Sequence, residues 1–206
     1  MLSKHKGKDL PRRIWHFIWE EDSLLSWVVN VIIAFLLIKF IVYPGLGLVL
    51  GTTHPVVAVV SNSMHHDAGF ETWWVSQAGF YEEQGITRED FYHFKMRNGF
   101  NKGDIIVLRG CSPKNLKVGD IIVFRSKRPD PIIHRIIKTW DEGSEQYFVT
   151  KGDNNQVSIQ DSSLDETRIG RDQIIGRAAL RVPFLGYIKI WFVGFVRLIF
   201  PGFLIG

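Results

Sequence analysis

An apolar segment near the N-terminus constrains this chain more than any other feature. The twenty residues from Leu24 to Tyr43 contain one charge, Lys39, within a turn of the end. As a helix they would cross a hydrocarbon core of about 30 Å, and the stem of Lys39 can reach the headgroups. A cleaved signal peptide is the alternative, but its apolar region is roughly 7–15 residues, and no Ala-x-Ala-like cleavage site is obvious here. The sequence therefore predicts a retained transmembrane helix over residues 23–43.

The charges that flank this segment predict its orientation. No Lys or Arg follows the segment until Arg88, whereas the cationic residues before it are Lys4, Lys6, Lys8, Arg12 and Arg13. Cytoplasmic flanks of membrane spans carry an excess of Lys and Arg. We therefore expect a single-pass protein of the cell membrane, with residues 1–22 cytoplasmic and residues 44–183 extracytoplasmic.

The length of the chain leaves room for about one domain of ordinary size besides the membrane segment. Of the 206 residues 46% are hydrophobic, which is high for a soluble protein and low for a chain with many membrane spans. No cluster of Lys and Arg with interleaved aromatic residues indicates nucleic-acid binding. The single cysteine, Cys111, excludes an internal disulfide and a thiolate metal cluster within one chain.

Short β-branched runs bounded by Gly and Asp predict an antiparallel sheet. The run Gly-Asp-Ile-Ile-Val-Leu-Arg at 103–109 is nearly repeated at 119–125, and each copy is typical of a turn followed by a strand. Further strands are expected at 55–60, 132–139, 146–151 and 173–178. Their regular spacing indicates a mainly β domain, an antiparallel sheet or partial barrel, over residues 44–183.

Residues 67–100 form an insert that is rich in aromatic residues. Thr87, followed three residues later by Asp90, is a helix-start signal, so we predict a short helix near Arg88–Lys95 within an otherwise irregular segment. The aromatic side chains fit two alternatives. They are either part of the core or a belt at the membrane interface, where amphipathic rings prefer the headgroup level.

Two serines and a histidine could carry chemistry. Ser61 and Ser63 follow the strand at 55–60, so on an extended chain both hydroxyls point to one side, although Ser-x-Ser is also a turn signal. His134 shares a strand face with Ile132 and Ile136. Such a histidine is commonly a packed core residue, but apolar surroundings also favour the neutral imidazole that a general base requires.

Two aspartates are candidates for the carboxylate that such a base needs. Asp153 follows a glycine, as turn residues do, and Asp161 could be a plain surface carboxylate. A serine nucleophile needs a base to take its proton, and the base needs a carboxylate to fix its tautomer. Ser63, His134 and either aspartate would complete this set, and residue chemistry alone does not choose between them.

Five short blocks occur in a fixed order along the chain. They are Ser61-Asn62-Ser63-Met64, the two Gly-Asp-Ile-Ile-Val runs, Ile133-His134-Arg135-Ile136, Lys151-Gly152-Asp153-Asn154-Asn155 and Gly176-Arg177-Ala178. With these blocks the chain resembles, from about Val56 to Tyr187, type I signal peptidases of the archaeal and endoplasmic-reticulum branch. In the bacterial branch a lysine takes the base position, so His134 indicates the histidine branch. The resemblance implies a signal-peptidase-like β domain and a membrane-bound serine endopeptidase that removes signal peptides from exported preproteins, without a metal or cofactor.

The resemblance also implies roles for individual residues. Ser63 would be the nucleophile and His134 the general base. The hydroxyl of Ser61 and the backbone N–H of Ser63 would form the oxyanion hole. Asp161 is expected as the triad carboxylate and Asp153 as a supporting residue, although Asp161 follows Asp153 by eight residues where the family usually has six.

The chain departs from the family pattern at two further places. His66 stands where the family normally has proline, and the insert 67–100 is longer than the usual link. His65, His66 and Asp67 could suggest a metal site together with His93. Adjacent histidines point in opposite directions on an extended chain, so we expect no metal.

Residues 184–206 are apolar but contain Lys189 and Arg197, and Pro201 interrupts them. A central arginine costs about 2.5–3.5 kcal/mol on insertion scales, which disfavours a second span without excluding it. We expect an apolar, membrane-associated C-terminal helix, which is either interfacial or a second span.

The expected partners are signal-peptide-bearing preproteins and the lipid bilayer, with the translocation machinery or other subunits as further candidates. A rival interpretation is a non-catalytic β domain on a membrane anchor, which binds exported chains or a partner subunit. A self-cleaving regulator with a related fold is another, but it would need no membrane span.

Overall fold

A computed structural model of the chain describes residues 9–185 together with Tyr187 and Trp191. The chain divides into two compact units, residues 1–49 and 50–206, which are described separately. Most of the predicted C-terminal segment 184–206 lies outside the described residues.

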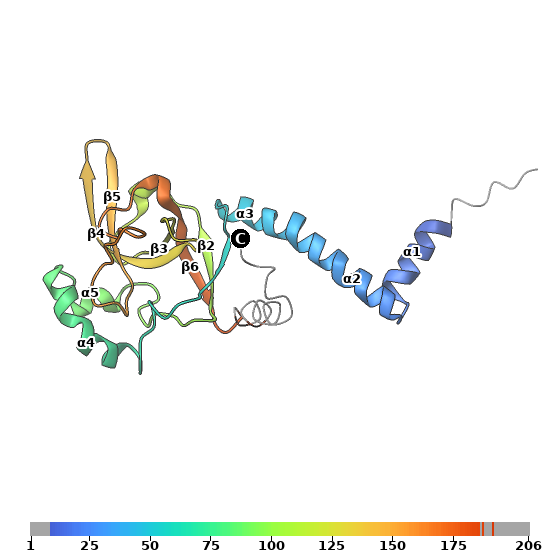
Figure 1. The fold of residues 1–206 in the computed structure, drawn as a ribbon, viewed down its shortest axis with the longest axis horizontal. Helices are drawn as coiled ribbons and strands as arrows, with labels where there is room; N and C mark the ends of the chain where they lie inside the picture. The colour runs from blue at the N-terminus through green and yellow to red at the C-terminus, as the bar shows by residue number, and fades with distance from the viewer. Residues whose placement is uncertain (1–8, 186, 188–190, 192–206) are drawn as a thin grey trace, which may run out of the picture. The chain divides into compact units, whose positions relative to one another are not determined.

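The first unit consists of helices. The elements are α1 (Asp9–Trp19), α2 (Leu24–Leu37), a π-helical turn (Ile38–Val42) and α3 (Tyr43–Leu50), as Figure 1 shows. The last three form one continuous apolar helix, Leu24–Leu50, with 27 residues, and its most apolar 18-residue stretch has a mean hydropathy of 2.5. This helix is long and apolar enough to cross a membrane, and it contains most of the span predicted from the sequence.

The apolar helix continues past Tyr43, where the predicted span ended. Pro44 has no N–H, and in a regular α-helix its ring would clash with the carbonyl of Phe40. Here the N–H of Tyr43 bonds to the carbonyl of Ile38, one residue further back than in an α-helix. The wider π turn gives the proline ring room, so Pro44 does not end the helix.

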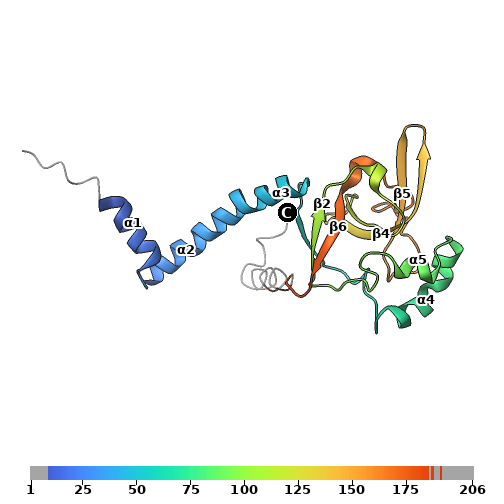
Figure 2. The same cartoon turned by 180° about the vertical axis from the view of Figure 1, so that it is seen from behind.

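The second unit is built on one six-stranded antiparallel sheet (Figures 1 and 2). The strands are β1 (Val56–Ala58), β2 (Ile105–Arg109), β3 (Ile121–Phe124), β4 (Ile132–Glu142), β5 (Glu145–Lys151) and β6 (Ile174–Val182). Their order is β1-β2-β6-β3-β4-β5, and each neighbouring pair is antiparallel. The predicted fold class, a mainly β domain behind an N-terminal apolar helix, is confirmed.

The two copies of the Gly-Asp motif make the same local hydrogen bonds. Asp104 accepts a hydrogen bond from the backbone N–H three residues before it at 2.7 Å, and Asp120 does so at 3.1 Å. Each aspartate also pairs with an arginine of β6, Asp104 with Arg181 and Asp120 with Arg177. The motif therefore closes a turn before β2 and before β3, and it fastens both strands to β6, which lies between them.

The aromatic insert contains a helix that the sequence interpretation missed. Helix α5, Arg88–Tyr92, lies within the predicted range and starts at the expected capping box. Helix α4, Phe70–Glu83, occupies a stretch that was expected to be irregular. The available signal was the spacing of Phe70, Trp73 and Trp74, which lie three or four residues apart as on one face of a helix.

Most aromatic residues of the insert are core, which favours the first alternative. Those of α4 and α5, except the exposed Tyr92, pack in one cluster with Ile137 of β4, so α4 and α5 cover the sheet near its β4–β5 edge (Figure 1). The buried members from the insert are Phe70, Trp73, Trp74, Tyr81, Ile86 and Phe91. Phe100 is buried in a second cluster.

A buried charge also joins the insert to the sheet. Lys151 ends β5 and is fully buried. Its Nζ donates to Oε1 of Gln77 at 2.9 Å and lies 4.9 Å from the ring of Phe80 and 4.6 Å from that of Tyr81, all on α4. Loss of hydration lowers the pKa of Lys151 to about 8.

Replacing Lys151 by methionine should change how stability varies with pH. Lys151 titrates near 10.5 when unhindered and near 8 in the folded chain, so between these values the unfolded chain binds a proton that the folded chain has released. This linkage raises the free energy of unfolding as the pH rises from about 8 to about 10.5, by about 3 kcal/mol.

We expect the Lys151→Met variant to lose this rise when the full chain is unfolded chemically in detergent. Lys138→Met removes an exposed lysine of β4 and should keep the wild-type pH profile. Parallel profiles for wild type and Lys151→Met would contradict the buried-charge account.

Candidate active site

The two predicted serines lie in the turn after β1, and their hydroxyls meet. Ser61 Oγ and Ser63 Oγ are 3.1 Å apart and share a hydrogen bond. Strand β1 ends at Ala58, so a turn brings the hydroxyls together rather than the alternation of an extended strand. Ser63 is half-buried and Ser61 is exposed, which leaves both within reach of a bound chain.

The loop after β5 holds the serine turn in place. The N–H of Asn154 donates to the carbonyl of Ser63 at 2.8 Å, and its side-chain amide donates to the carbonyl of Asn62 at 3.2 Å. The N–H of Asp153 donates to the sulfur of Met64 at 3.3 Å. Two segments that lie far apart in the sequence are thereby fixed against each other.

The side chain of His134 lies close to the serine turn, and the small space between them is next to Gly152, where a larger residue would not fit. A Cβ atom placed on Gly152 would lie 2.8 Å from His134 Nε2 and 2.8 Å from the carbonyl oxygen of Ser63. These two atoms are therefore separated by no more than twice that distance. In this structure the Ser63 hydroxyl bonds to Ser61, and catalytic hydrogen bonds are commonly loose until substrate binds.

The other nitrogen of His134 bonds to a glutamate that the sequence interpretation did not select. His134 Nδ1 and Glu166 Oε1 form a short hydrogen bond in the interior, where Glu166 is fully buried. Two further donors fix this carboxylate, Thr150 Oγ1 at 2.9 Å and the N–H of Ile159 at 2.8 Å. A carboxylate on Nδ1 keeps that nitrogen protonated, which leaves Nε2 free to accept a proton from a nucleophile.

Asp161, expected as the triad carboxylate, lies on the surface instead. It accepts hydrogen bonds from the side chain and N–H of Ser163 and from the N–H of Leu164, and it pairs with Arg128 at 2.9 Å. The hydrogen bonds from Ser163 and Leu164 lower the pKa of Asp161 to about 2. Its oxygens are occupied in a local turn, and Glu166 takes the position beside His134 that Asp161 was expected to fill.

The signal for Glu166 in the sequence was weak. Glu166 lies two residues after Leu164, which is the spacing that puts two side chains on one face of an extended segment. Both are buried. Glu166 differs from the second aspartate of the family in residue type and in its distance from Asp153, so the family spacing does not predict it.

Asp153 lies at the centre of a buried polar cluster behind the serine turn. Its carboxylate receives two hydrogen bonds from Arg135, at 2.9 and 2.7 Å, and one from His66 Nε2 at 3.0 Å. Burial alone would raise the pKa of Asp153, but the charge and hydrogen bonds of Arg135 hold it well below its usual range. The sequence interpretation gave Asp153 a supporting role, and in the structure this carboxylate faces Arg135 and His66.

His66, at the position where the family normally has proline, joins this cluster to the insert. Its ring stacks on Trp73 of α4 with centroids 3.7 Å apart and an interplanar angle of 3°. Burial lowers the pKa of His66, so the neutral ring donates from Nε2 to Asp153. Within the described residues no three His, Cys, Asp or Glu side chains are arranged to hold a metal ion.

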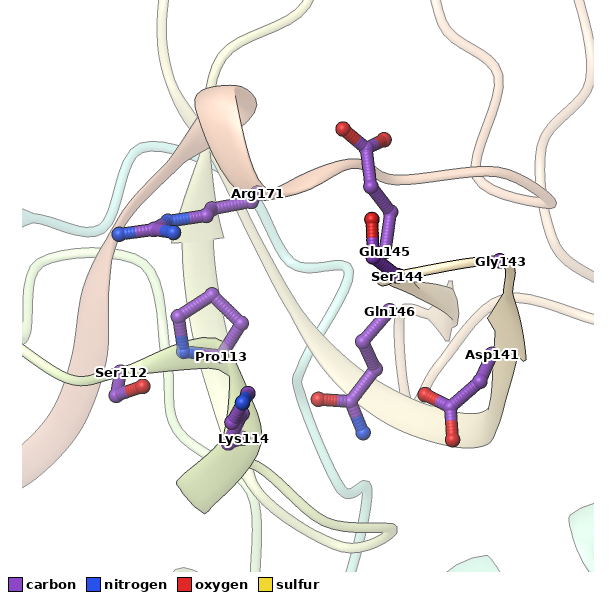
Figure 3. A pocket seen from close by; sticks show the side chains of 9 residues that line it. All are labelled: Ser112, Pro113, Lys114, Asp141, Gly143, Ser144, Glu145, Gln146 and Arg171. Atoms are coloured by element: carbon purple, nitrogen blue, oxygen red, sulfur yellow. The ribbon is translucent and has the colours of Figure 1, made fainter.

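A pocket of about 590 Å³ lies apart from these residues, at the turn between β4 and β5 (Figure 3). Lys114 and Arg171 line one side of it, and Asp141 and Glu145 line the other. None of the predicted site residues lines this pocket, so it is not part of the candidate active site.

Comparison with known proteins gives a consistent family relationship. No family model matches the chain. The signal peptidase complex catalytic subunit SEC11 of Colletotrichum graminicola is 28% identical over 154 residues, which cover 73% of this chain and 71% of the relative. The protein of that name from Pyricularia oryzae is 35% identical over 100 residues, which cover 46% of this chain and 57% of the relative.

A mammalian relative is named for the same function as the two fungal ones. The signal peptidase complex catalytic subunit SEC11C of Canis lupus familiaris is 31% identical over 98 residues, which cover 46% of this chain and 51% of the relative. The shorter alignments thus span little more than half the length of these relatives. The resemblance drawn from the ordered sequence blocks is confirmed: the homologues of this chain are catalytic subunits of signal peptidase complexes, of the endoplasmic-reticulum branch of type I signal peptidases.

Proposed function

We propose that this chain is a membrane-anchored endopeptidase that removes signal peptides from exported preproteins through an acyl-enzyme on Ser63. The observation that carries the proposal is the position of His134. Its Nδ1 bonds to the buried Glu166, and its Nε2 faces the turn that holds Ser63. This order of nucleophile, base and carboxylate is what serine catalysis requires.

The proposed reaction has two halves. Ser63 Oγ attacks the carbonyl carbon of the scissile bond while His134 Nε2 takes the hydroxyl proton. The imidazolium then gives this proton to the leaving amine, and the acyl group stays on Ser63 as an ester. In the second half His134 takes a proton from water, the hydroxide attacks the ester, and the proton returns to Ser63. Glu166 stabilises the imidazolium in both halves and keeps its negative charge.

Ser61 is proposed to stabilise the oxyanion together with the N–H of Ser63. The Ser61 hydroxyl lies 3.1 Å from Ser63 Oγ, so rotation about one bond can turn its proton from Ser63 to an oxygen on the attacked carbon. Donors placed where negative charge develops contribute more to the rate than donors that bind the ground state equally well. Asp153 is proposed to act indirectly, by holding the loop that supports the serine turn.

The membrane anchor is proposed to place this site where substrates emerge. The helix Leu24–Leu50 has the length and hydropathy of a span, and the cationic N-terminal residues favour a cytoplasmic N-terminus. Signal peptides insert into the same membrane, and their cleavage sites emerge at its outer surface. The relatives are named as subunits of a signal peptidase complex, so we propose that this chain also works with partner subunits.

Ser63→Ala should abolish cleavage of a preprotein by the detergent-purified full chain, because no other group supplies the nucleophile. The matched control is Ser162→Ala, which removes an exposed hydroxyl from the surface turn near Asp161 and should leave cleavage unchanged. The measurement is the appearance of one new N-terminus at the signal boundary. Normal cleavage by Ser63→Ala would contradict the assignment of Ser63 as the nucleophile, whereas no cleavage by the unaltered chain would support the rival interpretation, a non-catalytic binding domain.

Ser61→Ala should lower kcat and leave KM nearly unchanged, since the oxyanion exists only after attack. Loss of one oxyanion donor typically lowers kcat by about 10²–10³. Ser61→Thr keeps a hydroxyl and should recover most of the rate. A raised KM at unchanged kcat, or no recovery with threonine, would instead assign Ser61 to substrate binding or to the folding of the turn.

A further inference from the structure

Helix α1, Asp9–Trp19, has one apolar and one cationic side. At about 100° per residue, the helix places Leu10 and Ile14 side by side on the apolar face. Arg12, Arg13 and His16 gather on the opposite side. An amphipathic helix of this kind is stable where its apolar face is buried against an apolar surface and its charged face contacts water or other polar groups. The other members of the apolar face are Trp15, Phe17 and Ile18, and Trp19 lies at its border, next to Arg12.

Most of this apolar side is uncovered in the part of the chain that the structure describes. The exposed fractions are 62% for Leu10, 50% for Ile14, 61% for Trp15 and 70% for Trp19. Phe17 and Ile18, nearest to α2, are only half-buried. Contiguous exposed apolar side chains of this size mark a surface that another phase or molecule covers.

Two hydrogen bonds tie the end of α1 to the apolar helix. Ser26 Oγ donates to the carbonyl of Phe17 at 2.6 Å, and Asn30 Nδ2 donates to the carbonyl of Ile18 at 2.8 Å. Both carbonyls belong to the last turn of α1, where no partner exists within the helix. The donors are polar residues of the segment that is proposed to cross the membrane.

These two hydrogen bonds fix how deeply the end of α1 lies in the membrane, provided that the proposed membrane anchor is correct. Asn30 lies about 9 Å along the helix from Leu24, at a rise of roughly 1.5 Å per residue. An unpaired amide at that depth would be exposed to acyl chains, where unsatisfied polar groups are strongly disfavoured. The pairing with Ile18 therefore holds the C-terminal end of α1 at the level of the headgroups and the first acyl carbons.

We propose that α1 lies in the plane of the membrane as an interfacial helix that binds anionic lipid. Its apolar side would enter the boundary between headgroups and acyl chains, and Arg12 and Arg13 would meet lipid phosphates. The preceding residues Lys4, Lys6 and Lys8 add positive charge to the same segment. Basic amphipathic helices with Trp on the apolar side bind such surfaces. Together, α1 and the apolar helix would fix the depth of the anchor.

Spin labels on the full chain test this placement. In a Cys111→Ser background, single cysteines replace Ile14, His16 and Val31, and each variant is labelled with a nitroxide in vesicles that contain phosphatidylglycerol. We expect the label at position 14 to collide more with oxygen than with a water-soluble nickel chelate, and the label at position 16 to show the reverse. The Arg12→Gln/Arg13→Gln pair should weaken this contrast, and so should vesicles of neutral phosphatidylcholine alone.

Other results would overturn the proposal. Nickel access at both positions 14 and 16 would put α1 in water, and protection of both from both reagents would indicate a protein partner or a second copy. A contrast that is equal in neutral and anionic vesicles would exclude anionic lipid as the ligand. The label at position 31 separates these failures from failure of the anchor itself, because nickel access there would contradict the proposed span. Preprotein cleavage in the same vesicles reports the proposed activity independently.

Discussion

The ion pair between Arg135 and Asp153 is the interaction on which the second unit, with its six-stranded sheet, depends. All five N–H donors of Arg135 are bonded, two to the Asp153 carboxylate and the others to the carbonyls of Lys95, Met96 and Gly119. One buried guanidinium thus joins strand β4, the loop after β5, the end of the insert and the turn before β3. Removing one partner of such a buried pair typically costs about 3–5 kcal/mol, because the other charge is left without compensation.

This arrangement explains how a small sheet can hold the proposed catalytic residues in place. His134 and Arg135 are neighbours on β4, so their side chains point to opposite faces of the strand. Arg135 fixes the loop through Asp153, and the backbone of that loop holds the serine turn through Asn154. The insert completes the cluster from outside, since His66 bonds to Asp153 and stacks on Trp73. His134 and the turn that holds Ser63 are therefore positioned from opposite sides of one strand.

The sequence predicted correctly those elements whose structure depends on residues close to one another in the chain. The β-branched runs predicted the strands, alternation predicted that His134 is buried, and the Thr87 capping box predicted α5. Prediction failed where a distant contact decides the outcome. Helix α4 forms because its aromatic face packs on β4, and Glu166 reaches His134 because the segment after the β5 loop folds back onto β5. Neither contact can be read from a short window of sequence.

The central claim is that Glu166, and not Asp161, supports His134. The most direct measurement is kcat for preprotein cleavage by full-length Glu166→Gln and Asp161→Asn, each checked for wild-type thermal unfolding in detergent. Glutamine keeps the shape and an acceptor but loses the charge that stabilises the imidazolium, so the account predicts a fall in kcat on the order of 10³–10⁴ for Glu166→Gln. Asp161→Asn changes only the surface turn and should stay close to wild type. A folded, active Glu166→Gln beside an inactive Asp161→Asn would contradict the account.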